Sequence, residues 1–290
     1  MTSSPPSSPT SAASGSAITI LFFGDIVGRP GRRGVRQYLD RLRVTGGLPD
    51  VVIANVENVS HGFGLMDKHY HELSEAGIDI MTGGNHIWDK KDLFDSIADM
   101  PKLLRPANMH PGTPGSGAKL FDFTQRGSGK SFQLGVVNLI GQAFMGNYPP
   151  PWPEAEAHIT RLRAKTPHIF VDLHAETTAE KAALAHLSLK WGASALVGTH
   201  THVQTADERI LAGRLGFITD AGFNGPYGSI IGMEPKTSIA KMTSHAPVKL
   251  EVMEATVAQI NAVWFELNDT TGNCLAIRRI QDVIQLNEHF

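Results

Sequence analysis

The sequence predicts an α/β fold, and three observations support this prediction. Apolar runs of strand length alternate with helical segments over the first hundred residues, which is the pattern of a largely parallel sheet. After Pro101 the strand-like runs lie closer together, which indicates a second sheet, mixed or antiparallel. No internal repeat or interdomain linker interrupts the chain, so residues 17–290 are predicted to form a single domain.

The first hundred residues read as strand followed by helix, three times over. The first helical segment carries Val35, Leu39 and Leu42 on one face. Gly77 is expected to end the second helix, because glycine readily adopts the left-handed conformation that closes helices. The strands are expected at residues 17–23, 51–54 and 78–81. The second and third helices are expected at residues 67–76 and 89–98.

Short apolar runs continue through the rest of the chain, separated by turn-forming residues. Two stretches rich in Gly or Pro, residues 109–117 and 148–153, are expected to be loops. The strands are expected at residues 103–104, 119–123, 132–139, 169–173, 195–197, 217–219, 248–252 and 257–267. The helices are expected at residues 154–164, 179–191 and 235–242, the second of them capped by Gly192.

The composition argues against a protein that binds long nucleic acid, spans a membrane or depends on disulfides. A net charge of −2 provides no field to attract long nucleic acid, and no apolar run approaches the roughly 20 residues of a membrane helix. The single cysteine, Cys274, excludes an intrachain disulfide and favours a cytoplasmic location. Residues 1–16 are almost entirely Ser, Pro, Thr, Ala and Gly, and they are predicted to be a disordered tail.

Five of the expected strands end in side chains that can bind a metal ion. These side chains are Asp25, Glu57 with Asn58, Asn85 with His86, His174, and His200 with His202. Open α/β sheets place their ligand crevice at the carboxyl ends of strands. The fold is therefore expected to bring three imidazoles, two carboxylates and two amides to one edge, with His86 beside them.

The types of side chain indicate a chemistry. A phosphodiester is anionic and repels hydroxide, and two divalent cations roughly 3.5–4 Å apart offset that charge and acidify a bridging water. A carboxylate can bridge the two ions, and neutral imidazole or amide groups complete their coordination. Mixed nitrogen and oxygen ligands favour Fe or Mn, with Zn also suitable, over Ca or Mg. The residues therefore predict two divalent or mixed-valence metal ions per chain.

Each of these residues also has a plain structural interpretation when taken alone. Asp25 could cap a helix, Asn58 could support a turn, and a lone His174 is more often structural than a ligand. His200 and His202 are expected to alternate along an extended segment, so that both rings point the same way. Five such residues or pairs at equivalent topological positions favour the metal centre over the separate structural roles.

The motifs at these strand ends resemble those of the calcineurin-like metallophosphoesterase superfamily and, more closely, its bacterial YmdB-like branch. The resemblance extends from Ile20 to Ile280. It rests on long runs in the same order: FGDIVGRPGR, ANVENVSHGFG, TGGNHIWD, FVDLHAE, VGTHTHVQTADERI and NGPYGSIIGM. The branch is described as cyclic-nucleotide phosphodiesterases. The resemblance therefore implies this activity and an αββα sandwich, in which two mixed sheets are flanked by helices.

The resemblance also implies a role for each residue at the strand ends. The first metal would be held by Asp25, Glu57, Asn58 and His202. The second metal would be held by Glu57 as the bridge, Asn85, His174 and His200. His86 would lie near the phosphate as the catalytic residue, stabilising charge or protonating the leaving oxygen. Val27 stands where the wider superfamily has a histidine, and Glu57 where it usually has an aspartate; both departures match the YmdB-like branch.

These observations lead to one function and two alternatives. The chain is expected to be a cytoplasmic dinuclear phosphodiesterase in which a metal-bridging hydroxide attacks a cyclic nucleotide or a similar small phosphodiester. The absent histidine at Val27 leaves open a regulatory protein that binds nucleotide or metal with little turnover. A dinuclear phosphomonoesterase is the third possibility, and the resemblance makes a homo-oligomer plausible.

Four further residues are expected near the centre. Glu176 and Asp207 follow ligand motifs closely and are expected to orient imidazoles by accepting their N–H groups. Trp152 and Tyr227 are candidates for the walls of a base-binding pocket, with ordinary packing as the alternative for both.

Overall fold

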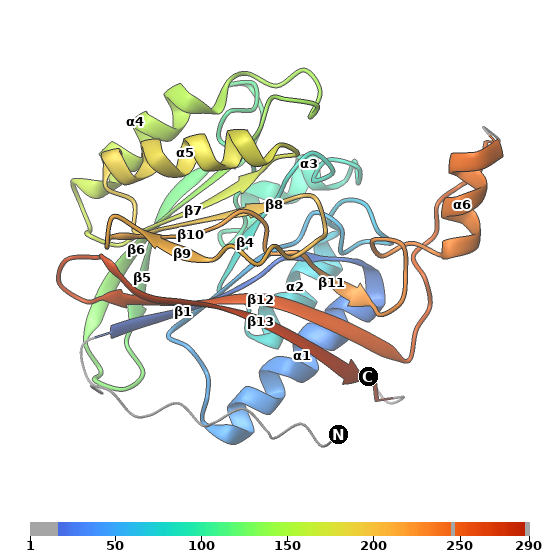
Figure 1. Ribbon diagram of the computed structural model, residues 1–290, viewed down its shortest axis with the longest axis horizontal. Coiled ribbons are helices and arrows are strands. Elements are labelled where there is room, and N and C mark those ends of the chain that lie inside the picture. Colours follow the sequence, from blue (N-terminus) through green and yellow to red (C-terminus); the bar gives the residue numbers. More distant parts are fainter. Residues whose placement is uncertain (1–16, 245–246, 288–290) are drawn as a thin grey trace.

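The computed structural model describes residues 17–244 and 247–287, which form two sheets that face each other, with helices on their outer faces (Figure 1). The first sheet has the order β2-β11-β12-β1-β3-β4, with β13 paired to β12. The second has the order β5-β6-β7-β8-β10-β9. The predicted αββα sandwich is thus confirmed. The predicted disorder of residues 1–16 lies outside the described residues.

The elements of the first sheet and its helices come from both ends of the chain. Its strands are β1 (Ala17–Phe23), β2 (Asp25–Ile26), β3 (Val51–Asn55), β4 (Ile80–Thr82), β11 (Phe223–Pro226), β12 (Val257–Asn268) and β13 (Cys274–Gln285). Its helical segments are α1 (Gly28–Thr45), α2 (Asp67–Ala76), α3 (Leu93–Ser96) and the 3-10 turn η1 (Ile97–Asp99). The helix α6 (Pro235–Ser244) projects from the body of the molecule (Figure 1).

The second sheet comes from the middle of the chain. Its strands are β5 (Ala118–Thr124), β6 (Ser131–Ile140), β7 (Ile169–His174), β8 (Ala195–Thr199), β9 (Arg209–Leu211) and β10 (Leu215–Ile218). Its helices are α4 (Pro151–Arg163) and α5 (Thr178–Trp191), which cover its outer face (Figure 1). The strands β6, β7 and β8 are parallel and are connected through α4 and α5, as βα connections produce. The strand β10 is also parallel to β8 but follows β9, without a helix between them.

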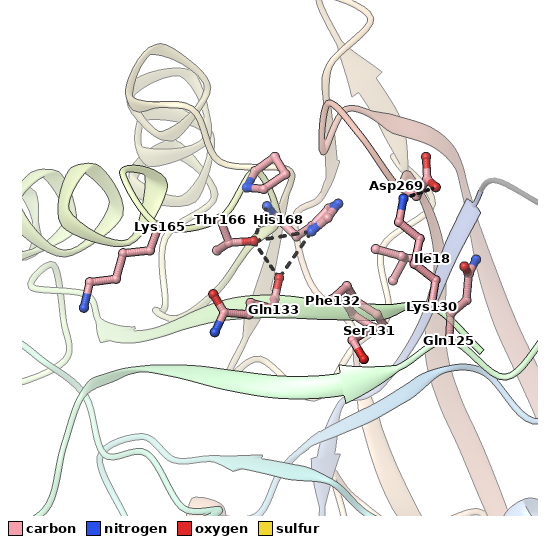
Figure 2. A pocket seen from close by; sticks show the side chains of 11 residues that line it. Ile18, Gln125, Lys130, Ser131, Phe132, Gln133, Lys165, Thr166, His168 and Asp269 are labelled. Carbon is pink, nitrogen blue, oxygen red and sulfur yellow. Dashed lines mark hydrogen bonds and ion pairs between the residues drawn. The ribbon is translucent and has the colours of Figure 1, made fainter. Parts of the chain in front are cut away.

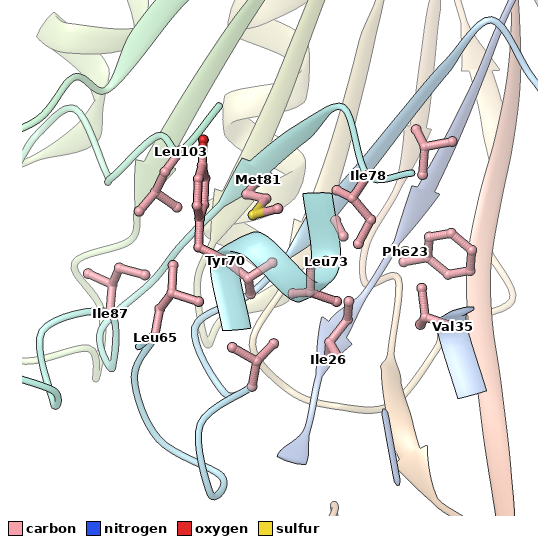
Figure 3. Packing of buried hydrophobic residues seen from close by; sticks show 14 of the residues in the cluster. Phe23, Ile26, Val35, Leu65, Tyr70, Leu73, Ile78, Met81, Ile87 and Leu103 are labelled. Atoms are coloured by element: carbon pink, nitrogen blue, oxygen red, sulfur yellow. The ribbon is translucent and has the colours of Figure 1, made fainter. Parts of the chain in front are cut away.

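Apolar side chains fill three layers, one between the sheets and one under each set of helices. Between the sheets, Phe22 stacks on Phe170 with ring centroids 5.5 Å apart, and Phe265 meets Phe170 edge-on at 5.6 Å. Figure 3 shows the layer under α1 and α2, where Phe23 and Leu73 belong to one buried cluster. Strands buried on both faces explain why β1 and β3 read as continuous apolar runs.

The last strands of the chain join the first sheet, although the sequence pattern favoured the second sheet for them. The strand β12 lies antiparallel to β1 over the whole of β1, and β13 and β11 pair with β12. The register places Val263, Phe265 and Leu267 against the second sheet, in the central apolar layer. Burial of this apolar face joins the two distant parts of the chain in one sheet.

Several predicted elements differ from the expected bounds. Residues 103–104 and 248–252 contribute only the isolated bridges of Leu103 to Met81 and of Val252 to Met233. The helix expected at residues 89–98 is reduced to α3 and η1, because the preceding loop is tied to the candidate site through His86. The helix α4 begins three residues before the expected Glu154, since Pro151 suits a first helical position that needs no N–H bond.

Candidate metal centre

The candidate centre lies where the carboxyl ends of strands from both sheets meet. Asp25 lies in β2, directly after β1, and Glu57 follows β3 by two residues. Asn85 follows β4, His174 is the last residue of β7, and His200 comes directly after β8. The backbone therefore brings these strand ends to one edge of the sandwich, as the sequence predicted.

Three side chains meet around one ring nitrogen of His174. Its Nε2 lies 3.0 Å from Asn85 Oδ1, 3.1 Å from Glu57 Oε1 and 3.1 Å from His200 Nδ1. Potential ligand atoms of Glu57, His174 and His200 all lie within 4.8 Å of one another. This spacing of one carboxylate, one amide and two imidazoles suits a single metal ion of the Fe, Mn or Zn type.

Two further oxygens of predicted ligands are buried without a hydrogen-bond donor. They are Asp25 Oδ1, which lies 3.7 Å from His174 Nδ1, and Asn58 Oδ1. The amide nitrogen of Asn58 donates to Gly62 O at 2.9 Å, so this side chain is held in place. A buried oxygen without a donor costs about 1–3 kcal/mol, which a bound cation would recover. The residues present therefore fit the expected metal ions.

The electrostatics of the centre also favour a bound cation. Burial alone would lower the pKa of His174, but the charge of Glu57, with Asp25 and Asp172, raises it to about 9. Burial raises the pKa of Asp25 and raises that of Asp172 to about 7. Three carboxyl groups are thus buried around one imidazole, and a bound cation would stabilise their charged forms.

A network of buried polar side chains orients His174, and the sequence did not predict it. His174 Nδ1 lies 2.9 Å from Thr199 Oγ1, which donates to Asp172 Oδ1 at 2.9 Å. Thr82 Oγ1 and Asn55 Nδ2 donate to the other Asp172 oxygen, at 2.5 and 3.2 Å. The signal in the sequence was an acidic residue inside the apolar strand that ends at His174.

The segment after β8 is a turn, so the expectation of an extended His-x-His pair is wrong. His200 has φ 103° and His202 has φ 63°, whereas an extended strand has negative φ. Asp220 Oδ2 accepts from the backbone N–H and the hydroxyl of Thr201, at 3.1 and 2.9 Å, and from Lys181 Nζ at 2.7 Å. The turn therefore depends on a buried ion pair formed with α5.

The turn separates the two histidines. His200 lies in the cluster, and its Nε2 is 3.1 Å from Glu176 Oε2, as expected for an orienting carboxylate. His202 Nδ1 lies instead 2.9 Å from Ile231 O, and its ring stacks on Phe223 at 5.4 Å. The charge of His202 nevertheless offsets part of the burial that raises the pKa of Asp25.

His86 lies at the rim of the centre and not within the cluster. Its backbone N–H donates to Glu57 Oε2 at 2.9 Å, while its ring Nδ1 lies 2.8 Å from Asp89 Oδ2. The ring meets Phe63 edge-on at 4.9 Å and is about one-third exposed. His86 is therefore oriented by Asp89 and open to solvent, which differs from the buried environment of His174.

Gly84 allows this loop to approach the cluster. A Cβ atom at this position would lie 2.3 Å from His174 Cδ2 and 2.4 Å from Glu57 Oε2. No side chain fits at those distances, so the glycine is required by close approach and not by an unusual φ.

Three of the further predicted residues lie away from the cluster. Asp207 does not orient an imidazole, since its carboxylate binds Thr205, Thr219 and Arg209. Trp152 packs against the apolar layer beside α4 and α5, which is the ordinary packing role. Tyr227 lines a cleft that includes His202.

A separate cleft of 280 Å³ lies at the opposite ends of the strands (Figure 2). It is lined by residues at the amino ends of β1, β6 and β7, among them Ile18 and His168. Both ring nitrogens of His168 lie 3.2 Å from backbone carbonyls, and Lys130 pairs with Asp269 at 2.9 Å. These groups already have partners and are distant from the strand ends that carry the centre. Within the described ranges, no helix is both long and apolar enough to cross a membrane.

The fold and the site define the class: an αββα sandwich with a buried carboxylate–imidazole centre at its strand ends. The chain belongs to the YmdB-like protein family, whose model matches residues 21–280. It is 44% identical over 261 residues to the 2′,3′-cyclic-nucleotide 2′-phosphodiesterase of Bacillus subtilis, covering 90% of this chain and 96% of that protein.

Two solved structures share the fold over nearly their whole length. A structure described as a novel phosphatase, from Mycoplasma pneumoniae, has a TM-score of 0.83 and 33% identity, covering 93% of this chain and 94% of that one. A hypothetical protein from Thermus thermophilus has a TM-score of 0.79 and 34% identity, covering 91% of this chain and 99% of that one. These relatives confirm the prediction that the chain is a phosphoric ester hydrolase.

Proposed function

We propose that this chain is a dinuclear metal-dependent phosphodiesterase that hydrolyses cyclic nucleotides. One observation carries the proposal: potential ligand atoms of Glu57, Asn85 and His200 surround His174 Nε2. In addition, one oxygen each of the predicted ligands Asp25 and Asn58 is buried and accepts no hydrogen bond. The name of the Bacillus subtilis relative supports a 2′,3′-cyclic nucleotide as the substrate class.

The residues divide into two sets of ligands that share one carboxylate. One ion would be held by Glu57, Asn85, His174 and His200, whose donor atoms already lie together. The other would be held by Asp25, Asn58, His202 and the same Glu57. When bound, the two ions would offset the charge of the phosphodiester and acidify a water at neutral pH.

Side chains of the protein would donate the proton and orient the imidazole ligands. His86 is held by Asp89 through Nδ1, which leaves Nε2 as the nitrogen that would donate a proton to the leaving oxygen. Thr199 and Asp172 hold the ring of His174, and Glu176 holds that of His200. Positioning by these groups keeps both imidazoles in place before substrate arrives.

The test measures metal content per chain together with hydrolysis of adenosine 2′,3′-cyclic phosphate and of bis-p-nitrophenyl phosphate, in Mn- and Fe-supplemented protein. We expect about two metals per chain and saturable turnover. Asp25→Asn should abolish turnover and lower the metal content. Asp122→Asn is the matched control, because this exposed carboxyl group on β5 hydrogen-bonds only Gln133 among the described side chains.

Two outcomes would contradict the proposal in different ways. One metal or none per chain, with hydrolysis no faster than background under either supplement, would favour the regulatory nucleotide- or metal-binding protein. Two metals with hydrolysis of p-nitrophenyl phosphate but of neither diester would favour a phosphomonoesterase. The description of the Mycoplasma pneumoniae structure as a phosphatase motivates this second candidate.

A further inference from the structure

A cleft of 690 Å³ opens beside the candidate centre, on the side of His86. The residues that line it include Trp88, Phe94, Gln142, Asn147, Tyr148 and Pro149. We propose that this cleft is the subsite for the nucleobase of the substrate, with the exposed face of Phe94 as the stacking surface. The inference rests on the proposed function, since it assigns a part of the substrate of that same centre.

Two short stretches of chain connect residues that line the cleft with residues of the centre. Trp88 is the second residue after His86, and Gln142 comes directly after Gly141, whose N–H donates to the carbonyl of His174 at 2.9 Å. Burial raises the pKa of Tyr148, and the charges of Glu57 and Asp89 raise it further. The position of Tyr148 within range of these charges agrees with a cleft that adjoins the loop carrying His86.

The aromatic side chains of the cleft are pre-positioned. Trp88 and Tyr148 pack against the buried apolar cluster under α1 and α2, and Trp88 Nε1 donates to Met109 Sδ at 3.2 Å. Phe94 lies 5.6 Å from Trp88 between ring centroids, yet it remains 54% exposed. An aromatic ring that is supported on one side and open on the other suits stacking with a base, which is sequence-tolerant because every base has a π-face.

Hydrogen bonds from residues that do not line the cleft also hold its walls in place. Asn108 Nδ2 donates to the carbonyls of Ile140 and Pro149, both at 2.8 Å, and so ties the end of β6 to the far wall. The carboxylate of Glu180 accepts from the N–H of Gln142 at 2.8 Å. A pre-formed cleft loses less conformational entropy on binding than a mobile one.

The polar groups of the cleft match a neutral ligand. Asn147 presents an amide that can donate to and accept from the edge of a base, and Gln142, whose Nε2 donates to the carbonyl of Tyr148 at 3.4 Å, can accept through its amide oxygen. Among the described residues, no carboxylate, lysine or arginine lines the cleft. A second phosphate or a peptide terminus would call for opposite charge. The volume also lies in the usual range for small-molecule sites, about 300–1,000 Å³.

A second cleft, of 550 Å³, lies on the side of His202 and is the rival location. Of the described residues that line it, Tyr227 is the only one with a ring apart from His202, and Asp282 adds a charge. Two of its amides are already engaged: Gln204 donates to the carbonyl of Ala262 at 3.0 Å, and Asn261 to that of Phe223 at 2.9 Å. It therefore offers less aromatic stacking surface than the cleft at Phe94, and it carries a charge that the cleft at Phe94 lacks among its described lining residues.

The experiment compares Phe94→Ala with Tyr227→Ala, a matched control because Tyr227 is 56% exposed and lines the rival cleft. The two substrates are adenosine 2′,3′-cyclic phosphate and the methyl riboside 2′,3′-cyclic phosphate, which has no base. For Phe94→Ala we expect KM to rise about five- to tenfold for the nucleotide and to stay unchanged for the baseless ester. Tyr227→Ala should change neither value.

A second readout does not depend on turnover. Calorimetric titration with adenosine 3′-monophosphate should give a Kd that is weakened about five- to tenfold in Phe94→Ala and unchanged in Tyr227→Ala. An effect confined to Tyr227→Ala, or equal effects on both esters, would overturn the nucleobase assignment while the phosphodiesterase remained. If the unmodified protein hydrolyses neither ester, the proposed function fails. In that case an unchanged Kd in Phe94→Ala would overturn the subsite as well, and a weakened Kd would support it.

Discussion

At the scale of single residues, the histidine side chains of the site differ in protonation and exposure because their surroundings differ. His174 is fully buried among carboxylates, which raise its pKa to about 9, whereas burial and the positive charge of His174 lower the pKa of His200 to about 3. His86 is partly exposed and has Asp89 as its partner. The environment therefore separates His86, the proposed catalytic residue, from the two proposed ligands.

Replacement of His86 tests this separation. His86→Ala should lower turnover by about 10²–10⁴-fold, the range for loss of a positioned acid, and leave the metal content unchanged. His71→Ala is the control, because this exposed histidine also pairs with an aspartate, Asp67, at 3.4 Å. Elemental analysis and steady-state kinetics measure both variants. Metal loss in His86→Ala alone would identify His86 as a ligand.

His69 predicts a dependence of stability on pH. Burial and the nearby charge of Arg32 lower its folded-state pKa to about 4, from about 6.5 in the unfolded chain. The unfolded state thus binds the extra proton between these values, so stability is full above pH 6.5 and falls as the pH drops toward 4. Between pH 7 and pH 5 this contribution should amount to about 1–2 kcal/mol.

Denaturant unfolding of the metal-free protein at both pH values measures this contribution. His69→Gln should have a smaller difference in unfolding free energy between pH 7 and pH 5 than the parent protein. His71→Gln is the control for a histidine that is exposed. Equal pH dependence in the parent and in His69→Gln would show that another group is responsible.

At the scale of elements, loops at the strand ends are held by contacts that lie several elements away. The turn after β8 is fixed by Asp220, which follows β10, and Asp220 is paired with Lys181 on α5. The loop after β4 approaches the cluster only because Gly84 has no side chain. The site geometry therefore depends on how α5 and β10 dock as well as on the ligand motifs themselves.

The ion pair of Lys181 with Asp220 is buried on both sides. Lys181→Met should cost about 3–5 kcal/mol of unfolding free energy, because Asp220 is left as an uncompensated buried charge. Adding Asp220→Asn to this variant should recover part of the loss, since the charge is then removed. Denaturant unfolding measures both proteins. A double variant no more stable than Lys181→Met would show that the cost arises from packing.

At the scale of the whole molecule, the ligands come from both sheets, so the centre exists only when the sandwich is assembled. Glu57 and Asn85 follow strands of the first sheet, while His174 and His200 follow strands of the second. The central apolar layer sets the separation of the sheets through contacts such as Phe22 on Phe170. Packing between the sheets is thus a condition for the cluster.

Phe170→Ala tests the unity of the fold. Removing this buried ring should cost about 3–5 kcal/mol and lower the midpoint of thermal unfolding, with a single transition retained. Circular dichroism and tryptophan fluorescence should report the same midpoint. Two separate transitions would contradict the prediction that residues 17–290 form one domain. Phe132→Ala, at a partly buried ring packed at the edge of the same layer, should cost less.

The sequence by itself determined most strands and helices, because apolar periodicity is a local pattern. Strand-end polarity, which is also local, predicted the eight site residues, and their roles stay proposals. The strand Ala17–Phe23 and the helix Asp67–Ala76 have the bounds that were expected. The expectations that no described residue or comparison tests, such as the cytoplasmic location and the homo-oligomer, stay predictions.

Only the tertiary structure decided how distant segments combine. The pairing of β12 with β1, the turn at His200, the Asp172 network around His174 and the cleft at Phe94 all join residues far apart in the chain. The physical reason is that such contacts depend on burial and on partners from other elements, which a periodic pattern along one segment does not encode.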